Sequence, residues 1–213
     1  MVKKSYKKIT VFVMMSGGVD SSVAAFLLQK QGYKVIGCFI KGYNLDGCQE
    51  KESEDARRVA EYLNIPFYTI DLEKEYKKLV VDYTVRSYKE GITPNPDVMC
   101  NKEIKFGLFF KKAVELGADY VATGHYVRLA FRDIFRGTGR LLAPAARSGL
   151  DSRLIRPAVG GGQAEFASET FRSKNPEKLA SFYLMEAKDK NKDQSYFLWT
   201  LNQSQLKRCL FPI

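Results

Sequence analysis

Short apolar runs alternate with amphipathic stretches over the first 123 residues of this 213-residue chain. Four apolar runs predict buried strands, at Ile9–Met15, Tyr33–Ile40, Phe67–Leu72 and Tyr120–Thr123. The stretches between them predict helices, at Ser22–Gln31, Lys51–Leu63, Glu73–Lys89 and Lys102–Leu116. Strands that alternate with helices predict an α/β fold, a Rossmann-like parallel sheet of the adenine-nucleotide alpha-hydrolase type with helices on both faces.

The pattern changes after Phe131. Between Phe131 and Arg172 every basic residue is arginine, the periodicity is weak, and glycine, alanine and serine are frequent. We interpret this segment as a surface insertion, with a basic arm that folds on RNA as the alternative. The sequence therefore predicts a catalytic unit over residues 1–130, an insertion over 131–173, and a return to the catalytic unit over 174–213.

The charge balance favours a polyanionic partner. The chain has 34 Lys and Arg against 24 Asp and Glu, a net charge of +10, and a pI of about 9.3. Nucleic acid is the first candidate, and simple solubility is the alternative. No apolar stretch is long enough to span a bilayer, and Ile9–Met15 is too short for a signal peptide core. We therefore expect a cytoplasmic protein without a membrane partner.

A glycine-rich run lies where the first predicted strand meets the first predicted helix, at Ser16-Gly17-Gly18-Val19-Asp20-Ser21-Ser22. Glycines let the backbone approach an oxyanion, and the N–H groups at a helix N-terminus hold it. Asp20 is suited to position a metal ion or an N–H group. No lysine follows the second glycine, so the run is not a Walker A loop. It resembles the pyrophosphate-binding loop of ATP pyrophosphatases.

Cys100 is the best candidate nucleophile among four widely spaced cysteines. It follows a loop in which Pro94 and Pro96 stiffen the backbone around Asn95. We expect Asp97 to cap the next helix and place Cys100 near its first turn. The helix N-terminus and nearby lysines, Lys102 and Lys105, should then lower the thiol pKa. Buried hydrophobic roles are expected for Cys38 in a strand and Cys209 in an apolar tail, and a loop position for Cys48.

Four motifs in series resemble the tRNA-specific 2-thiouridylase family. They are Ser16–Ser22, Asn95-Pro96-Asp97 through Cys100, Ala122–Tyr126 and Lys192–Leu198, within residues of about 9–130 and 188–213. The resemblance implies that ATP with Mg²⁺ adenylates the 2-oxygen of the wobble uridine in tRNA. A persulfide, supplied through a sulfur-donor protein, would then deliver sulfur. The target base must be extruded before its 2-position is reachable.

The resemblance also implies roles for individual residues. The ATP-binding residues would be Met14, Met15, Ser16, Gly17, Gly18, Val19, Asp20, Ser21, Ile40 and Gly124. The tRNA contacts would be Asn95, Pro96, Asp97, Lys192, Asp193 and Gln194. Cys100 and Asp97 would be the catalytic residues, and no metal-ligating residue is assigned. We expect a structural role for His125, the only histidine, and Tyr126 is a candidate for base stacking.

The chain departs from the family pattern at two points. Family members are longer and carry a second catalytic cysteine further on, which no residue here matches, and they lack the arginine-rich segment. We therefore expect this chain to bind ATP and to thiolate tRNA poorly. Two alternatives stay open: another ATP pyrophosphatase, which adenylates a carboxylate or a purine carbonyl, and a non-catalytic protein that binds nucleotide or RNA.

Overall fold

A five-stranded parallel sheet forms the centre of the protein in the computed structural model, which describes residues 8–44, 48–133, 138–141 and 180–213. Its order is β3-β2-β1-β4-β8, and the strands are β1 (Thr10–Met14), β2 (Lys34–Lys41), β3 (Phe67–Asp71), β4 (Tyr120–Ala122) and β8 (Cys209–Leu210). The four strands predicted from the sequence are confirmed. The fifth is a finding of the structure, because Cys209 pairs with Val121 of β4 rather than lying in a tail.

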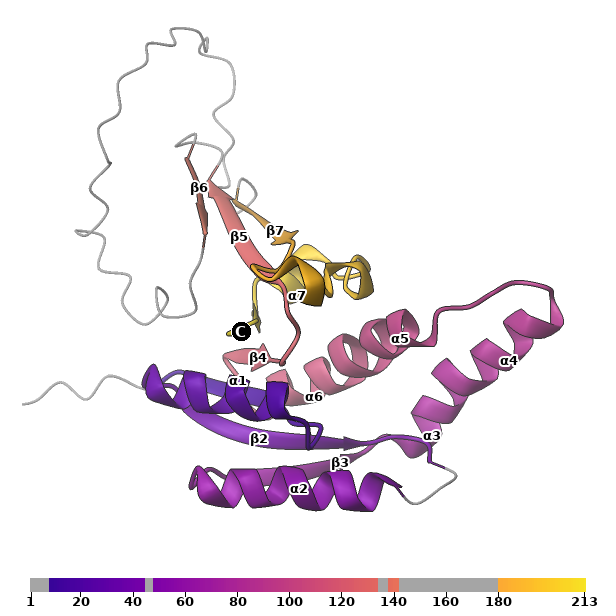
Figure 1. Cartoon of the computed structure of the whole chain (residues 1–213), viewed down its shortest axis with the longest axis horizontal. Helices are drawn as coiled ribbons and strands as arrows, with labels where there is room; N and C mark the ends of the chain where they lie inside the picture. Colours follow the sequence, from indigo (N-terminus) through magenta and orange to yellow (C-terminus); the bar gives the residue numbers. More distant parts are fainter. Residues whose placement is uncertain (1–7, 45–47, 134–137, 142–179) are drawn as a thin grey trace, which may run out of the picture.

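Helices cover both faces of this sheet, as predicted (Figure 1). Side chains alternate along β1, so that Val11 and Val13 face one helical layer while Phe12 and Met14 face the other. The first layer contains α1 (Val19–Lys30) and α2 (Cys48–Tyr62). Cys48 therefore begins a helix, and its expected loop position was wrong.

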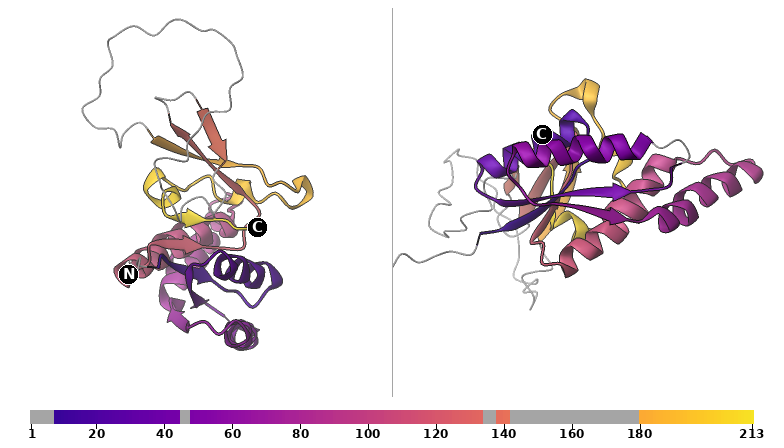
Figure 2. Two further views of the ribbon diagram at one scale, coloured as in Figure 1. Left: turned by 90° about the vertical axis from the view of Figure 1, so that its left-hand side faces the viewer. Right: turned by 90° about the horizontal axis from the view of Figure 1, so that it is seen from below.

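The second layer consists of two continuous helices, each with a π-helical segment. One joins α3 (Glu73–Tyr76), the π-helical η1 (Lys77–Val81) and α4 (Asp82–Lys89), and matches the predicted helix. The other joins α5 (Pro96–Met99), the π-helical η2 (Cys100–Phe109) and α6 (Phe110–Glu115), so it starts six residues before the predicted Lys102. Figure 2 shows both helices from below. π-Helical turns frequently mark functional sites.

Asn95, not Asp97, caps the second of these helices. Its side-chain oxygen accepts a hydrogen bond of 3.1 Å from the backbone N–H of Val98. Asp97 lies within the first turn. The prediction that Asp97 is the cap was wrong because Pro96, with its fixed φ and missing N–H, is suited to the first helical position, which moves the cap one residue earlier.

A second, antiparallel sheet follows β4. It contains β5 (Arg128–Asp133), β6 (Thr138–Leu141) and β7 (Ala180–Met185) in the order β6-β5-β7. The rings of Phe131 and Phe182 pack across β5 and β7 at 5.3 Å. The remainder of the predicted insertion, residues 134–137 and 142–173, lies outside the described residues.

Beyond β7 the chain returns to the first sheet through short elements. These are the 3-10 helices η5 (Lys190–Lys192) and η6 (Ser195–Phe197), and α7 (Gln203–Leu206), which precede β8. Leu198, Leu201 and Leu206 are buried in the core cluster that contains Phe106. Within the described ranges, no helix has the length and apolar character that a membrane span requires.

Candidate active site

The glycine-rich run forms a tight turn between β1 and α1. Gly17 has a φ of +80°, in the left-handed region that favours glycine, and Gly18 is the N-cap of α1. The backbone N–H of Ser16 donates to the Ser21 hydroxyl at 3.1 Å. The hydroxyls of Ser21 and Ser22 in turn donate to the carbonyl of Gly18, at 3.1 and 2.9 Å. The serines thus hold the loop in shape.

Two glycines allow other segments to press against this loop. A Cβ on Gly17 would lie 2.6 Å from the backbone oxygen of Glu52 in α2. A Cβ on Gly124, after β4, would lie 2.7 Å from the backbone of Asp20 and Ser21. Neither position has room for a side chain. The loop is therefore fixed from two sides by backbone contacts that only glycine permits.

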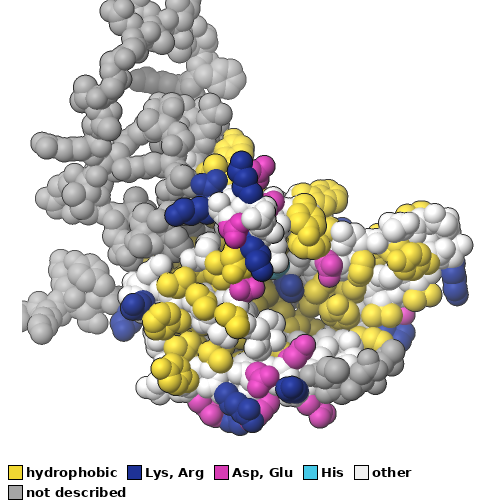
Figure 3. Space-filling view, in the orientation of Figure 1, with side chains coloured by type: hydrophobic (Ala, Val, Ile, Leu, Met, Phe, Trp, Pro, Cys, Tyr) yellow, Lys and Arg dark blue, Asp and Glu magenta, His cyan; other side chains and the backbone are white. Residues whose placement is uncertain are grey.

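A cavity of about 340 Å³ opens beside the loop, at the carboxyl ends of β1, β2 and β4. Ligands of parallel α/β sheets bind at this end of the strands. The lining includes most of the residues implied to bind ATP, namely Met14, Met15, Ser16, Asp20, Ser21, Ile40 and Gly124. Gly17, Gly18 and Val19 belong to the same loop but do not line the cavity. Figure 3 shows this face of the molecule hollowed at its centre, with hydrophobic side chains within the hollow.

Cys100 lines the same cavity, so the structure brings the candidate nucleophile and the glycine loop together. Burial raises the pKa of the Cys100 thiol above its ordinary value of 9.0. Lys105 and a hydrogen bond with the Tyr76 hydroxyl act in the opposite direction, while Asp97 adds to the rise. The expectation of a lowered pKa was therefore wrong, because the thiol packs against the core cluster.

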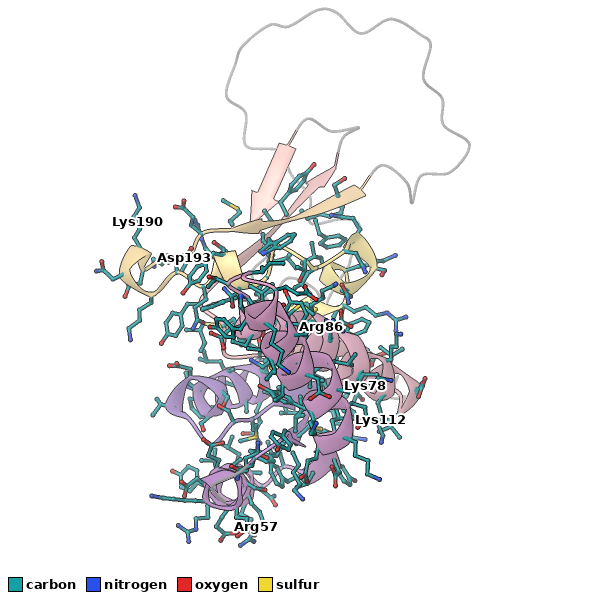
Figure 4. The ribbon with its side chains drawn as sticks, turned by 90° about the vertical axis from the view of Figure 1, so that its right-hand side faces the viewer. Arg57, Lys78, Arg86, Lys112, Lys190 and Asp193 are labelled. Carbon is teal, nitrogen blue, oxygen red and sulfur yellow. The ribbon has the colours of Figure 1, made fainter. Side chains whose placement is uncertain are left out.

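Of the implied tRNA contacts, only Gln194 lines the cavity. Asn95, Pro96 and Asp97 are exposed, one helical turn before Cys100. Lys192 is exposed as well. Figure 4 shows Asp193 on the loop that also carries Lys190, at the opposite end of the view from Arg57.

Asp193 and Gln194 use their side-chain oxygens within the chain. The Asp193 carboxylate accepts bonds of 2.7 Å from the backbone N–H of Ala187 and from the Ser195 hydroxyl, and these bonds lower its pKa. The Gln194 oxygen accepts a bond of 2.9 Å from the backbone N–H of Tyr126. Gln194 also lines the cavity. Within this motif the lysine is the group most open to an RNA phosphate.

Residues without an assigned role complete the lining, among them Tyr76, Lys105 and His125. Burial, with a smaller contribution from Lys105, lowers the pKa of His125 to about 3, so the imidazole is neutral at physiological pH. Its Nδ1 is hydrogen-bonded to the Thr123 hydroxyl at 2.8 Å. A helical residue such as Tyr76 carries no local sequence signal for this position, since only the packing of α3 beside η2 brings it to Cys100.

Metal-binding side chains do not gather within the described ranges: no group of three or more His, Cys, Asp and Glu is placed to hold an ion. Asp20 is the carboxylate of the glycine loop, and one of its oxygens accepts a bond of 2.9 Å from the Tyr126 hydroxyl. Mg²⁺ commonly binds through one or two carboxylates plus phosphate oxygens, so a loop with one carboxylate fits such an ion only together with a phosphate ligand.

Comparison with known proteins gives a consistent result. The tRNA-specific 2-thiouridylase MnmA of Karelsulcia muelleri is 41% identical over 207 residues, covering 97% of this chain and 43% of the relative. The protein of the same name from Flavobacterium johnsoniae is 43% identical over 210 residues, covering 95% of this chain and 42% of the relative. The chain thus spans less than half the length of these relatives. The resemblance to this family is confirmed.

Among solved structures, NMN synthetase from Francisella tularensis aligns over 54% of this chain and 44% of the synthetase chain, at 22% identity. The TM-score of 0.39 is too low to support an inference.

The model of the tRNA methyl transferase HUP domain matches residues 9–148 and 159–213. The match includes part of the segment 131–173, whose assignment as an insertion stays a prediction. Because the family model matches most of the length of this chain, the chain belongs to the tRNA methyl transferase HUP domain family.

Proposed function

We propose that this chain forms the nucleotide- and uridine-binding unit of a tRNA 2-thiouridylase. Such an enzyme uses ATP to activate the 2-oxygen of a tRNA uridine and replaces that oxygen with sulfur. One observation carries the proposal: the glycine loop after β1 and the thiol of Cys100 line the same cavity. The relatives named 2-thiouridylase support it, and a tRNA substrate agrees with the expected cytoplasmic location.

The cavity fits the chemistry of ATP. Its wall combines the start of α1, where helical N–H groups lack intrahelical partners, with the apolar side chains of Met15, Phe39 and Ile40. The first feature suits phosphate oxygens and the second a purine base. Asp20 is the residue that would hold Mg²⁺ jointly with the phosphates. When bound, ATP supplies the adenylyl group that turns the uridine 2-oxygen into a leaving group.

The residues around Cys100 then serve the sulfur step. Tyr76 hydrogen-bonds the thiol, and Lys105 is close enough to stabilise the thiolate. Cys100 would accept the outer sulfur of a persulfide carried by a donor protein, and the donor's thiol would be released. That sulfur on Cys100 would then attack C2 of the adenylated uridine and displace AMP. A thiol of the donor protein would attack the Cys100 sulfur of the resulting disulfide, which frees 2-thiouridine and leaves Cys100 in a disulfide with the donor. Asp97 is proposed to hold the extruded base beside the thiol.

The tRNA would approach from the exposed side of this site. Asn95, Pro96 and Asp97 lie there, and Lys192 is proposed to bind a backbone phosphate. Further cations lie on the neighbouring helices, with Lys78, Arg86 and Lys112 on the side that faces the viewer in Figure 4. Contacts of this kind predict tRNA binding that weakens steeply with salt.

ATP–pyrophosphate exchange tests the proposal on the chain as it exists. We expect exchange that requires a tRNA with an unmodified wobble uridine. It should persist in Cys100→Ser, since activation does not use the thiol, and in the control Cys48→Ser. Gly124→Ala should abolish it because the added Cβ would collide with the loop. Exchange without tRNA would support another ATP pyrophosphatase instead, and absence of both exchange and ATP binding would overturn the proposal.

A further inference from the structure

The only histidine of the chain lies in this cavity with one ring nitrogen already engaged. His125 follows Gly124, whose backbone touches the first turn of α1, and its imidazole lines the cavity. The Nδ1 atom is 2.8 Å from the hydroxyl oxygen of Thr123. The other ring nitrogen, Nε2, has no hydrogen-bond partner within the described ranges. Nε2 is therefore the atom that His125 offers to a ligand.

The bonds of Thr123 decide which nitrogen carries the proton. The Thr123 hydroxyl oxygen accepts the backbone N–H of His125 at 3.4 Å, and the side chain is buried. Its own proton needs an acceptor, and among described residues the structure offers only Nδ1 of His125. If Nδ1 carried the proton instead, the hydroxyl would receive two donors and its own proton would be left without a partner. Satisfying both groups places the ring proton on Nε2.

We infer that His125 is a ligand-binding residue, a neutral imidazole whose Nε2–H donates a hydrogen bond to an anionic oxygen of the bound nucleotide. This inference rests on the proposed function, since it assigns a further contact within the same site. Lys105 lies beside His125 and adds positive charge for the same anion. Lys105 would supply positive charge to the anion, and the neutral imidazole of His125 would supply a directed N–H donor.

A neutral donor suits this place better than an imidazolium. Burial and Lys105 both disfavour a second proton on the ring. The other titratable groups that line the cavity are Asp20, Cys38, Tyr43, Glu52, Tyr76 and Cys100. Despite the two carboxylates among them, the pKa of His125 stays low, so the imidazole keeps the same form across the physiological range. The donor thus does not depend on the working pH.

Nitrogen-15 labelling of histidine tests this directly, because a single histidine gives a single set of ring signals. The ring correlations of the free chain should show the Nε2–H tautomer. Saturating ATP should shift the Nε2–H signal downfield, as expected for a new hydrogen bond. An Nδ1–H tautomer, or an Nε2–H signal that does not move while ATP binds, would overturn the inference.

Substitutions separate the tautomer from the ligand contact. Thr123→Val should increase the population of the Nδ1–H tautomer, and Thr123→Ser should not. His125→Gln, which keeps a donor near the Nε2 position, should bind ATP within about threefold of the parent, whereas His125→Asn should bind about tenfold or more weakly. Equal losses in the two variants would contradict the contact. If the parent chain fails to bind ATP at all, the proposed function and the contact fall together, while the tautomer is still read from the free chain.

Discussion

The hydroxyl of Tyr76 hydrogen-bonds the thiol of Cys100, and each residue adjoins the start of a π-helical segment. Tyr76 comes from the helix after β3 and Cys100 from the helix that precedes β4. This bond opposes the effect of burial, which otherwise raises the thiol pKa. The contact makes Tyr76 a positioning residue for the candidate nucleophile.

Tyr76→Phe should therefore raise the pKa of Cys100 further. The phenyl ring preserves the packing but removes the hydroxyl that stabilises the thiolate. The pH dependence of iodoacetamide alkylation measures this pKa in a Cys48→Ser background, in which Cys38 and Cys209 are buried. Tyr43→Phe is the matched control, since Tyr43 lines the same cavity. An unchanged or lower pKa in Tyr76→Phe would contradict the assigned contact.

Lys105→Met should move two pKa values at once. Lys105 lowers the pKa of both Cys100 and His125, so its removal should raise both. Alkylation reports the thiol, and nitrogen-15 spectra report the histidine. Lys102→Met is the control, because Lys102 is exposed and pairs with Glu103 at 3.1 Å. A shift of one pKa without the other would contradict the effect of Lys105 on both groups.

The neutral His125 predicts a loss of stability in mild acid. Its pKa is lowered from 6.5 to about 3 on folding, so the unfolded chain binds more protons between these values. The contribution of His125 to the unfolding free energy is fully present above pH 6.5 and is lost as the pH falls toward 3. Between pH 7 and pH 5 this group should cost at most about 2 kcal/mol of unfolding free energy. Urea denaturation at both pH values measures the loss, which should shrink in His125→Gln. An equal loss in that variant would assign the effect to other groups.

Substitutions at Asn95 distinguish its role as a helix cap, which affects stability, from its implied role in tRNA binding. Asn95→Ala should lower the unfolding free energy by about 1 kcal/mol, because the N–H of Val98 loses its acceptor. Asn95→Asp should keep the cap and weaken tRNA binding, because it replaces the amide of an implied tRNA contact with a negative charge. Asp97→Ala is the control, since Asp97 is exposed and does not cap. Urea denaturation measures the first effect and tRNA binding the second. Equal stability of Asn95→Ala and the parent would contradict the cap.

Most strands of the main sheet could be predicted because each is marked by residues close to it in the sequence. Apolar runs of β1 to β3 are bounded by glycine or proline turns, and the glycine loop follows β1 directly. The second sheet gave no such signal. Its strand β7 pairs with β5 across a long intervening segment, and β8 has only two residues. Pairing of this kind depends on tertiary contacts rather than on periodicity.

The candidate site was predictable in its composition but not in its electrostatics. The family resemblance implied that the glycine loop and Cys100 would belong to one site, and the glycine loop was expected at the carboxyl end of a strand. The motifs did not reveal that burial outweighs the lysines at Cys100, nor that Tyr76 reaches the thiol. The sequence also did not reveal the hydrogen bond between Thr123 and Nδ1 of His125. That bond is the reason why we infer a donor role for His125 in the cavity, where the sequence led us to expect a structural role. Burial and side-chain partners are set by packing, which spacing along the chain does not encode.

Protection of Cys100 by ATP tests most directly whether the glycine loop and the thiol share one ligand cavity. The measurement is the rate of maleimide labelling of Cys100 in the Cys48→Ser background, with and without saturating ATP and Mg²⁺. Because both features line a cavity of about 340 Å³, bound nucleotide should slow labelling severalfold, and Gly124→Ala should abolish this protection. ATP that binds, as shown by calorimetry, and leaves the labelling rate unchanged would contradict the shared cavity.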